Sequence, residues 1–179
     1  MTTQCKKAIV DIARQALYRH FGEKPTVGVR IEDYPELSEK AGVFISIYMD
    51  DELRGCIGHI EADMPLANIV AEMAVHAATQ DPRFNPIEKN ELPDVRFEIS
   101  VLSPMELTID FTTIKVGEHG LFIQVGEARG LLLPQVATRY EWTTEEFLRE
   151  TCRKAQLPED AYTRSDAKVS KFSAQIIKE

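Results

Sequence analysis

The fold of this chain depends most on one short stretch, Leu53-Arg54-Gly55-Cys56-Ile57-Gly58-His59-Ile60. It has the pattern of a strand with apolar ends, and it carries two glycines, an arginine, a cysteine and a histidine. Glycine weakens the interior of a strand, because it has no side chain to pack and loses much conformational freedom on folding. We therefore expect another part of the backbone, or a ligand, to approach this strand closely.

A second strand is predicted directly before this stretch. In residues 43–49, apolar and other side chains alternate as in a strand with one buried face. Residues 50–52 form a short polar turn, so residues 53–60 are expected to return antiparallel as the second arm of a hairpin.

Regular alternation along that second arm decides which side chains share a face. Leu53, Gly55, Ile57 and His59 are predicted on one side, and Arg54, Cys56, Gly58 and Ile60 on the other. Cys56 and His59 therefore do not face each other in a regular strand. A bulge at Gly58 would change this, since glycine permits the kink that an extra residue produces.

The remaining elements follow from apolar periodicity and from residues typical of helix ends. The clearest end signal is a capping box, with Thr143 as N-cap and Glu146 at N3, flanked by a hydrophobic staple of Trp142 and Phe147. Helices are predicted over residues 4–21, 63–79 and 143–155, and further strands over 95–102, 121–125, 131–134 and 169–177.

Composition indicates one globular domain over residues 1–179. The hydrophobic fraction of 44% and charged fraction of 28% are ordinary for such a chain. A net charge of −8 argues against binding to nucleic acid, which needs clustered lysine and arginine. Three cysteines without paired spacing suit a reducing compartment. With no stretch long and apolar enough for a signal peptide or a spanning helix, we expect a cytoplasmic protein that does not bind membranes.

Several motifs, in one order along most of the chain, resemble the AMMECR family. The resemblance begins with Leu-Arg-Gly-Cys-Ile-Gly at residues 53–58. The other matching motifs are Gly42–Phe44, Asp81–Phe84, Ser100–Pro104, Gly117–Leu121, Gly130–Ala137, and Trp142 with Glu146–Leu148. The sequence departs from the family in Lys154-Ala155-Gln156-Leu157, where a glycine usually stands in place of Gln156. That change puts a left-handed helix stop in doubt, because glutamine is strained at positive φ.

The resemblance implies an α+β fold, with a largely antiparallel sheet flanked by helices and divided into a larger and a smaller lobe. It supplies no reaction. Bacterial and archaeal relatives resemble one component of a three-part system, the AmmeMemoRadiSam system, whose other parts are a Memo-like protein and a radical S-adenosylmethionine (SAM) protein. A role in a modification pathway with these two partners follows by association only. We expect no cofactor.

One hypothesis is that the chain is an enzyme. Cys56 would be a nucleophile or reactive thiol, with a pKa lowered by Arg54 on the same face. His59 or His76 would act as base, and Gln135 or glycine amides would stabilise an oxyanion. Cys-x-x-His supplies too few ligands for zinc, so we predict no metal site.

The other hypothesis is that the chain binds a ligand or a partner. The glycines would then let that molecule approach the sheet, and Arg54 would pair with its carboxylate or phosphate, while Cys56 only fills space. The predicted binding residues are Arg54, Gly55, Gly58, Asp81, Arg83 and Gln135. Asp81 and Arg83 also have a simpler interpretation, as a pair within their own loop. A third alternative is that residues 53–60 are purely structural and that function lies elsewhere.

Overall fold

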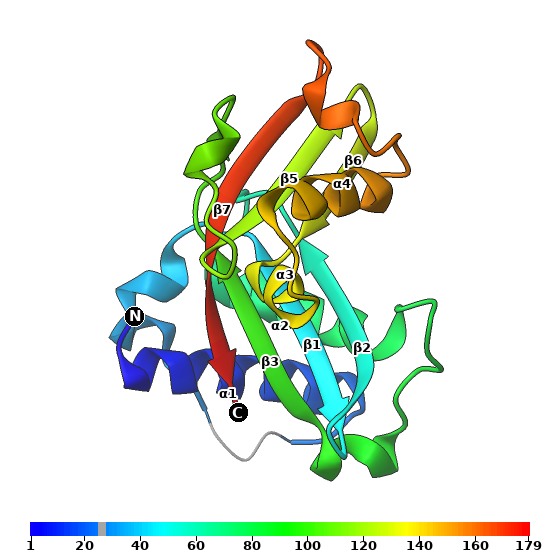
Figure 1. Cartoon of the computed structure of the whole chain (residues 1–179). Helices are drawn as coiled ribbons and strands as arrows, with labels where there is room; N and C mark the ends of the chain where they lie inside the picture. Colours follow the sequence, from blue (N-terminus) through cyan, green and yellow to red (C-terminus); the bar gives the residue numbers. More distant parts are fainter. Residues whose placement is uncertain (25–27) are drawn as a thin grey trace. The chain divides into compact units, whose positions relative to one another are not determined.

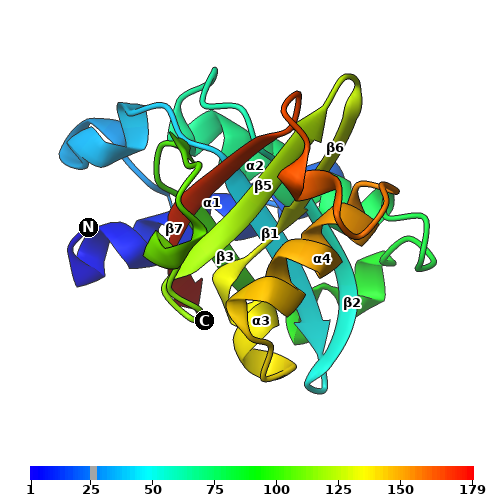
Figure 2. The ribbon, with the colours of Figure 1, turned by 45° about the horizontal axis from the view of Figure 1, so that its top comes forward.

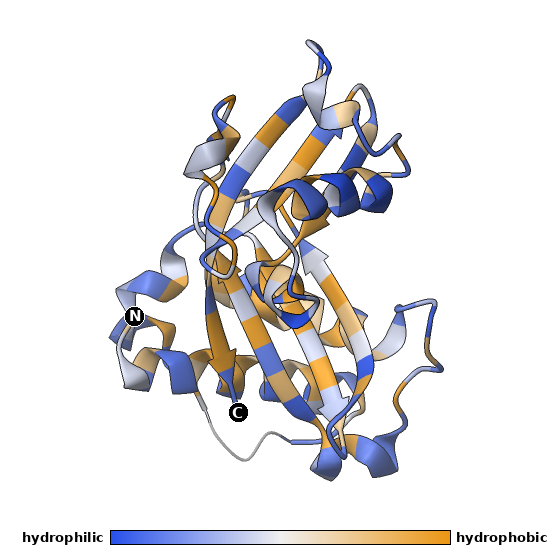
Figure 3. Ribbon diagram, in the orientation of Figure 1, coloured by the Kyte–Doolittle hydropathy of each residue, from blue (hydrophilic) through white to orange (hydrophobic). Residues whose placement is uncertain are grey.

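Alternating apolar side chains build three antiparallel strands in the first part of the chain. The computed structural model describes residues 1–24 and 28–179, and it places β1 at Val43–Met49, β2 at Glu52–His59 and β3 at Arg96–Leu102. They lie in the order β2-β1-β3 (Figure 1). Bands of alternating hydropathy follow β1 and β3 in Figure 3. The predicted hairpin of residues 43–60 is confirmed.

The hairpin turns at two aspartates and contains one extra residue. Asp50 and Asp51 both have positive φ, 49° and 63°, as the tightest hairpin turns require. Beyond the turn Leu53 pairs with Tyr48, but Gly55 pairs with Ile47. Arg54 is therefore the extra residue of a β-bulge. The bulge lies at Arg54 and not at Gly58, so strict alternation fails at Arg54.

Two helices cover one face of these strands. They are α1 (Thr3–His20) and α2 (Leu66–Thr79), and both pack with β1 and β3 in one hydrophobic core (Figure 2). The helix predicted over residues 4–21 is confirmed. The predicted start of the second helix at Asp63 is wrong, because Pro65 is its N-cap and Asp63 contacts His59.

The later part of the chain adds further strands to the sheet and has its own helices. The strands β7, β5 and β6 lie in that order, and β4 pairs with β7. Their bounds are Glu106–Leu107 for β4, His119–Val125 for β5, Ala128–Leu132 for β6 and Lys168–Lys178 for β7, with α3 at Pro134–Arg139 and α4 at Thr144–Lys154.

The helix-end signals of this second part are confirmed at α4. Thr143 Oγ1 accepts the Glu146 N–H at 3.3 Å, and the Glu146 carboxylate accepts the Thr143 N–H at 2.8 Å. The Trp142 and Phe147 rings lie 6.4 Å apart, as the staple predicts. Beyond α4, Gln156 adopts the left-handed conformation with φ 59°. The helix thus keeps its left-handed stop even though glutamine replaces the family's glycine.

One strand is shorter than its sequence predicts. The apolar run at residues 131–134 predicts a strand, but β6 ends at Leu132 and Pro134 begins α3. Proline is well suited to the first position of a helix, because its missing N–H has no helical acceptor there.

The chain divides into two compact units. Unit 1 comprises Met1–Leu102 with Gln175–Glu179, and unit 2 comprises Ser103–Ala174, so β7 contributes residues to both. Antiparallel strands with flanking helices form each unit, which confirms the predicted α+β class. Within the described part of the chain, no helix has the length and apolar character needed to cross a membrane.

Candidate functional site

The outer edge of β2 is closed by the loop that follows α2. The Cys56 N–H donates to Asp81 Oδ2 at 2.8 Å, and Arg83 Nη2 donates to the Cys56 carbonyl oxygen at 3.3 Å. Two side chains therefore satisfy the edge groups that another strand would otherwise pair with. As the simpler interpretation of these residues expected, Asp81 and Arg83 pair within their own loop. Their hydrogen bonds to the Cys56 backbone also attach this loop to the middle of residues 53–60.

Asp81 and Arg83 form a tight, two-pronged ion pair. Arg83 Nε lies 2.9 Å from Asp81 Oδ1, and Arg83 Nη2 lies 2.6 Å from Asp81 Oδ2. The carboxylate is nearly inaccessible at 3% exposure, while the arginine side chain is 56% exposed. Hydrogen bonds from Arg83, and then from the Cys56 N–H, lower the pKa of Asp81 to about 2 despite its burial. The pair therefore stays ionised at neutral pH.

The Cys56 thiol faces a hydroxyl group across the hairpin. Ser46 pairs directly with Cys56 in the β1–β2 register, and its Oγ donates to Cys56 Sγ at 3.3 Å. The hydrogen bond with Asp81 is the main cause that raises the pKa of Arg83, and Cys56 acts in the same direction with smaller effect. Arg83, already paired with Asp81, is therefore a cation that interacts with Cys56. Arg54 was predicted for this role.

Arg54 binds the loop that follows α2. Its guanidinium donates to the Asn85 and Pro86 carbonyl oxygens and lies 3.2 Å from Glu91 Oε1. Glu91 also accepts the Glu88 N–H at 2.6 Å, in the capping box of a short 3₁₀ helix at Lys89–Asp94. These contacts indicate that Arg54 fixes the loop in position.

The two glycines of β2 are closed in by the chain itself. A Cβ atom on Gly55 would lie 2.0 Å from the Ala77 carbonyl oxygen of α2, and one on Gly58 would lie 2.3 Å from the Phe44 ring. The close approach predicted from the sequence is thus made at Gly55 by a helix backbone. At each of these two positions, on opposite faces of the strand, the chain itself therefore fills the space beside the glycine.

Neither of the two candidate bases, His59 and His76, is a hydrogen-bond partner of Cys56 among the described residues. His59 Nε2 is 2.8 Å from Asp63 Oδ1, and His59 pairs with the buried Val43, on the opposite face of the hairpin from Cys56. His76 lies in α2. Gln135 belongs to α3, in unit 2.

Two residues of this site were missed by sequence reasoning. Ser46 is registered opposite Cys56, and Glu91 lies 37 positions from its partner Arg54. The turn predicted at residues 50–52 implies the pairing of Ser46 with Cys56, whereas no local pattern marks the contact of Glu91, since it depends on the path of the chain in space.

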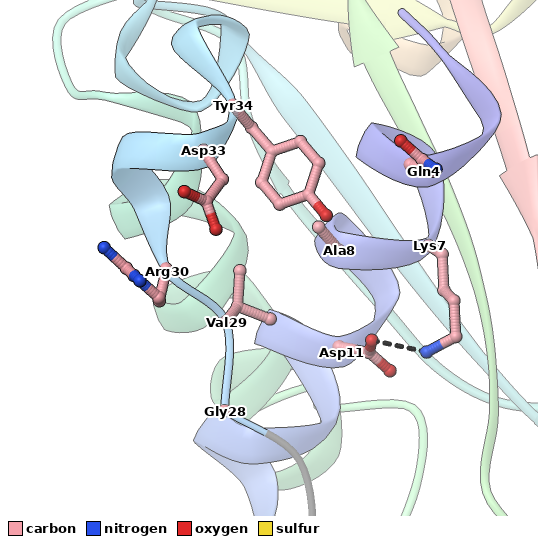
Figure 4. A pocket seen from close by; sticks show the side chains of 9 residues that line it. All are labelled: Gln4, Lys7, Ala8, Asp11, Gly28, Val29, Arg30, Asp33 and Tyr34. Atoms are coloured by element: carbon pink, nitrogen blue, oxygen red, sulfur yellow. Dashed lines mark hydrogen bonds and ion pairs between the residues drawn. The ribbon is translucent and has the colours of Figure 1, made fainter.

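A separate polar hollow lies between α1 and the segment that precedes β1. It has a volume of about 280 Å³ and is lined by Arg30, Asp33 and Tyr34 on one side and by Lys7 and Asp11 of α1 on the other. The Tyr34 ring extends toward the helix, whereas the Arg30 side chain points away from it (Figure 4). Lys7 Nζ and Asp11 Oδ2 are 2.6 Å apart. None of the predicted site residues lines this hollow, so it is distinct from the site at Cys56.

The sequence and structure both match known proteins. Residues 10–177 match the family described as AMMECR1. A protein of Methanothermobacter thermautotrophicus is 42% identical, over 97% of this chain and 93% of the relative, and Protein MJ0810 of Methanocaldococcus jannaschii is 42% identical, over 95% and 88%. The crystal structure of uncharacterized protein PH0010 from Pyrococcus horikoshii has a TM-score of 0.88 at 38% identity, covering 98% of this chain and 92% of that one. This chain is a member of the AMMECR1 family.

Proposed function

We propose that the chain is a binding component that recognises an acidic group on a partner protein through Arg83. One observation carries this proposal: the buried Asp81 fixes the guanidinium while more than half of the Arg83 side chain stays exposed. Nε and Nη2 are used by Asp81 and Cys56, whereas Nη1 has no hydrogen-bond acceptor among the described residues. A carboxylate or phosphate is the partner group that such a donor favours.

The Phe84 ring supports the same guanidinium from another side. Arg83 Cζ lies 5.3 Å from the centre of that ring, within the range of a cation–π contact. An arginine held by both a carboxylate and a ring loses little further conformational freedom when it binds. The entropic cost of ordering this side chain on binding is therefore small.

The Memo-like protein and the radical SAM protein of the modification pathway are our proposed partners. The family resemblance is what supports this choice, because it associates relatives of this chain with those two proteins. The cytoplasm is the matching compartment, and the three cysteines, which are all free thiols, agree with reducing conditions.

The alternative function is an enzyme that uses Cys56 as a reactive thiol, and the hydrogen bond of Arg83 to the Cys56 carbonyl oxygen favours it, because it brings a cation to this residue. The positive electrostatic potential of Arg83 is partly cancelled there, however, because the negatively charged Asp81 carboxylate accepts the Cys56 N–H at 2.8 Å. Ser46 is the side chain that hydrogen-bonds to the thiol, and it is no base at neutral pH. Geometry therefore favours binding over nucleophilic catalysis.

Binding to the Memo-like protein of the same genome tests the proposal. We expect Arg83→Gln to weaken binding about tenfold or more, because a buried or half-buried charge pair is lost. Arg83→Lys keeps the charge without the two-pronged geometry and should weaken binding less. Biolayer interferometry with each purified variant provides the measurement.

Arg164→Gln is a matched control for this experiment. Arg164 donates to Asp166 in the same two-residue spacing, with Nε–Oδ1 and Nη2–Oδ2 distances of 2.9 Å and 2.8 Å, and is 50% exposed. Its replacement should leave binding unchanged. Equal losses for Arg83→Gln and Arg164→Gln, or no binding by the unaltered protein at about 100 μM, would contradict the proposal.

A further inference from the structure

The last residues of β7 have one open edge in unit 1. The Glu179 N–H donates to the Phe97 carbonyl oxygen of β3 at 3.1 Å. Because successive residues of an antiparallel strand direct their backbone groups to opposite edges, Ile176 and Lys178 direct theirs away from β3. On that edge the register of β5 ends at Ser173. Within residues 1–24 and 28–179, no other strand is registered against Ile176 or Lys178.

A groove lies beside this open edge. It has a volume of about 480 Å³ and is bounded by α1 and by the end of β7, which lie next to each other near the C-terminus in Figures 1 and 2. Val10 and Ile176 give it an apolar part, and Lys6, Lys7 and Lys178 give it three cations. An unpaired strand edge next to a groove is the arrangement to which an extended peptide adds as a further strand.

The charges around this groove favour an acidic occupant. Its two carboxylates are already neutralised within the chain, Asp11 by Lys7 at 2.6 Å and Glu179 by Arg14 at 2.6 Å. Lys7 and Lys178 are themselves ion-paired, with Asp11 and Glu98, although Lys178 is 74% exposed. Lys6 has no ion pair among the described residues, so it is the lysine with an unpaired charge. The groove thus offers the unpaired Lys6 and the largely exposed Lys178 to an acidic segment, in a chain whose net charge is −8.

We propose that this edge and groove bind an extended segment of a partner protein in which an aliphatic residue is flanked by aspartate or glutamate. The backbone of that segment would pair with Ile176 and Lys178, its aliphatic side chain would contact Val10, and its carboxylates would meet Lys6 and Lys178. A second copy of this chain is a poorer occupant, because pairing the same edge with itself brings the lysines of both copies together. This surface shares no residue with the one around Arg83.

Fluorescence anisotropy with a labelled peptide of about eight residues, alternating glutamate with valine, tests this proposal. Saturable binding is expected, and it should weaken as salt is raised. The Ile176→Pro variant should abolish binding, since proline removes the outward N–H of Ile176 while leaving the β3 side of the strand intact. The double variant Lys6→Glu, Lys178→Glu should weaken binding about tenfold or more. This double variant tests the proposal even if the Ile176→Pro variant does not fold.

Two controls complete the experiment. The Lys168→Glu variant changes a lysine at the other end of β7 and should bind the peptide as the unaltered protein does. A peptide with lysine in place of glutamate should not bind. The proposal is overturned if Ile176→Pro folds and binds normally, or if both peptides bind equally. It is also overturned if no saturation occurs at about 1 mM, or if Ile176→Pro abolishes a concentration-dependent dimer of this chain.

Discussion

Replacing Gly55 by alanine is expected to destabilise the protein by about 3 kcal/mol, the upper part of the range for adding a methyl group to a packed core. The new Cβ would lie 2.0 Å from the Ala77 carbonyl oxygen. That oxygen belongs to the backbone of α2, so no side-chain rotation can relieve the clash, and β2 and α2 must move apart. Urea denaturation of the two proteins measures the loss as a change in the free energy of unfolding.

Gly28→Ala is the control for this prediction. No atom lies within 4 Å of a Cβ built on Gly28, and its φ is not positive. Its replacement should change the free energy of unfolding by less than about 1 kcal/mol, in the stabilising direction. A loss below about 1 kcal/mol for Gly55→Ala would show that the approach of α2 is not the reason for glycine at this position.

Asp81→Asn is expected to lower the free energy of unfolding by about 2 kcal/mol at pH 7. The folded protein holds the pKa of Asp81 at about 2, below its ordinary value of 3.8, and lowering a pKa by one corresponds to about 1.4 kcal/mol. A carboxyl group with a lowered pKa stabilises the fold above its unfolded pKa, and this stabilisation is lost as the pH falls through the folded pKa. The difference between the two proteins should therefore shrink between pH 4 and pH 2.

Asp166→Asn is the control that shows whether the loss of an exposed ion pair destabilises the protein as much as Asp81→Asn does. Asp166 pairs with Arg164 but is 57% exposed, and exposed pairs contribute little to stability. Its replacement should leave the denaturation midpoint nearly unchanged at pH 7. A difference between Asp81→Asn and the unaltered protein that stays constant from pH 7 to pH 2 would contradict the role assigned to the Asp81 charge.

The sequence was sufficient to predict the elements whose cause is local. Residues 43–49 became a strand because their apolar side chains alternate, and α4 began at Thr144 because Thr143 and Glu146 cap it. The glycine pattern of β2 correctly indicated a close approach. The sequence could not show that α2 makes this approach at Gly55, since contacts between distant segments have no local signature.

The bulge at Arg54 is the feature of the site that the sequence did not show. In a hairpin that turns at Asp50 and Asp51, simple pairing would place Ser46 opposite Gly55, and would bring Cys56 opposite the buried Ile45. The extra residue shifts the register by one, so Ser46 meets Cys56 and Gly55 meets Ile47. One such shift exchanges the two faces of a strand. The turn predicted at residues 50–52 implies the same pairing of Ser46 with Cys56, but the sequence does not show that it arises from a two-residue turn followed by a bulge at Arg54.

The rate at which Cys56 reacts with iodoacetamide at pH 7 tests most directly whether Arg83 serves to bind a partner or to activate Cys56 as a reactive thiol. Mass spectrometry distinguishes Cys56 from Cys5 and Cys152, which are fully buried and should react only after unfolding. We predict that native Cys56 reacts no faster than the same residue in urea, because it is partly buried and Asp81 offsets the charge of Arg83. A native rate about tenfold above the unfolded rate would contradict the binding proposal and favour catalysis by Cys56.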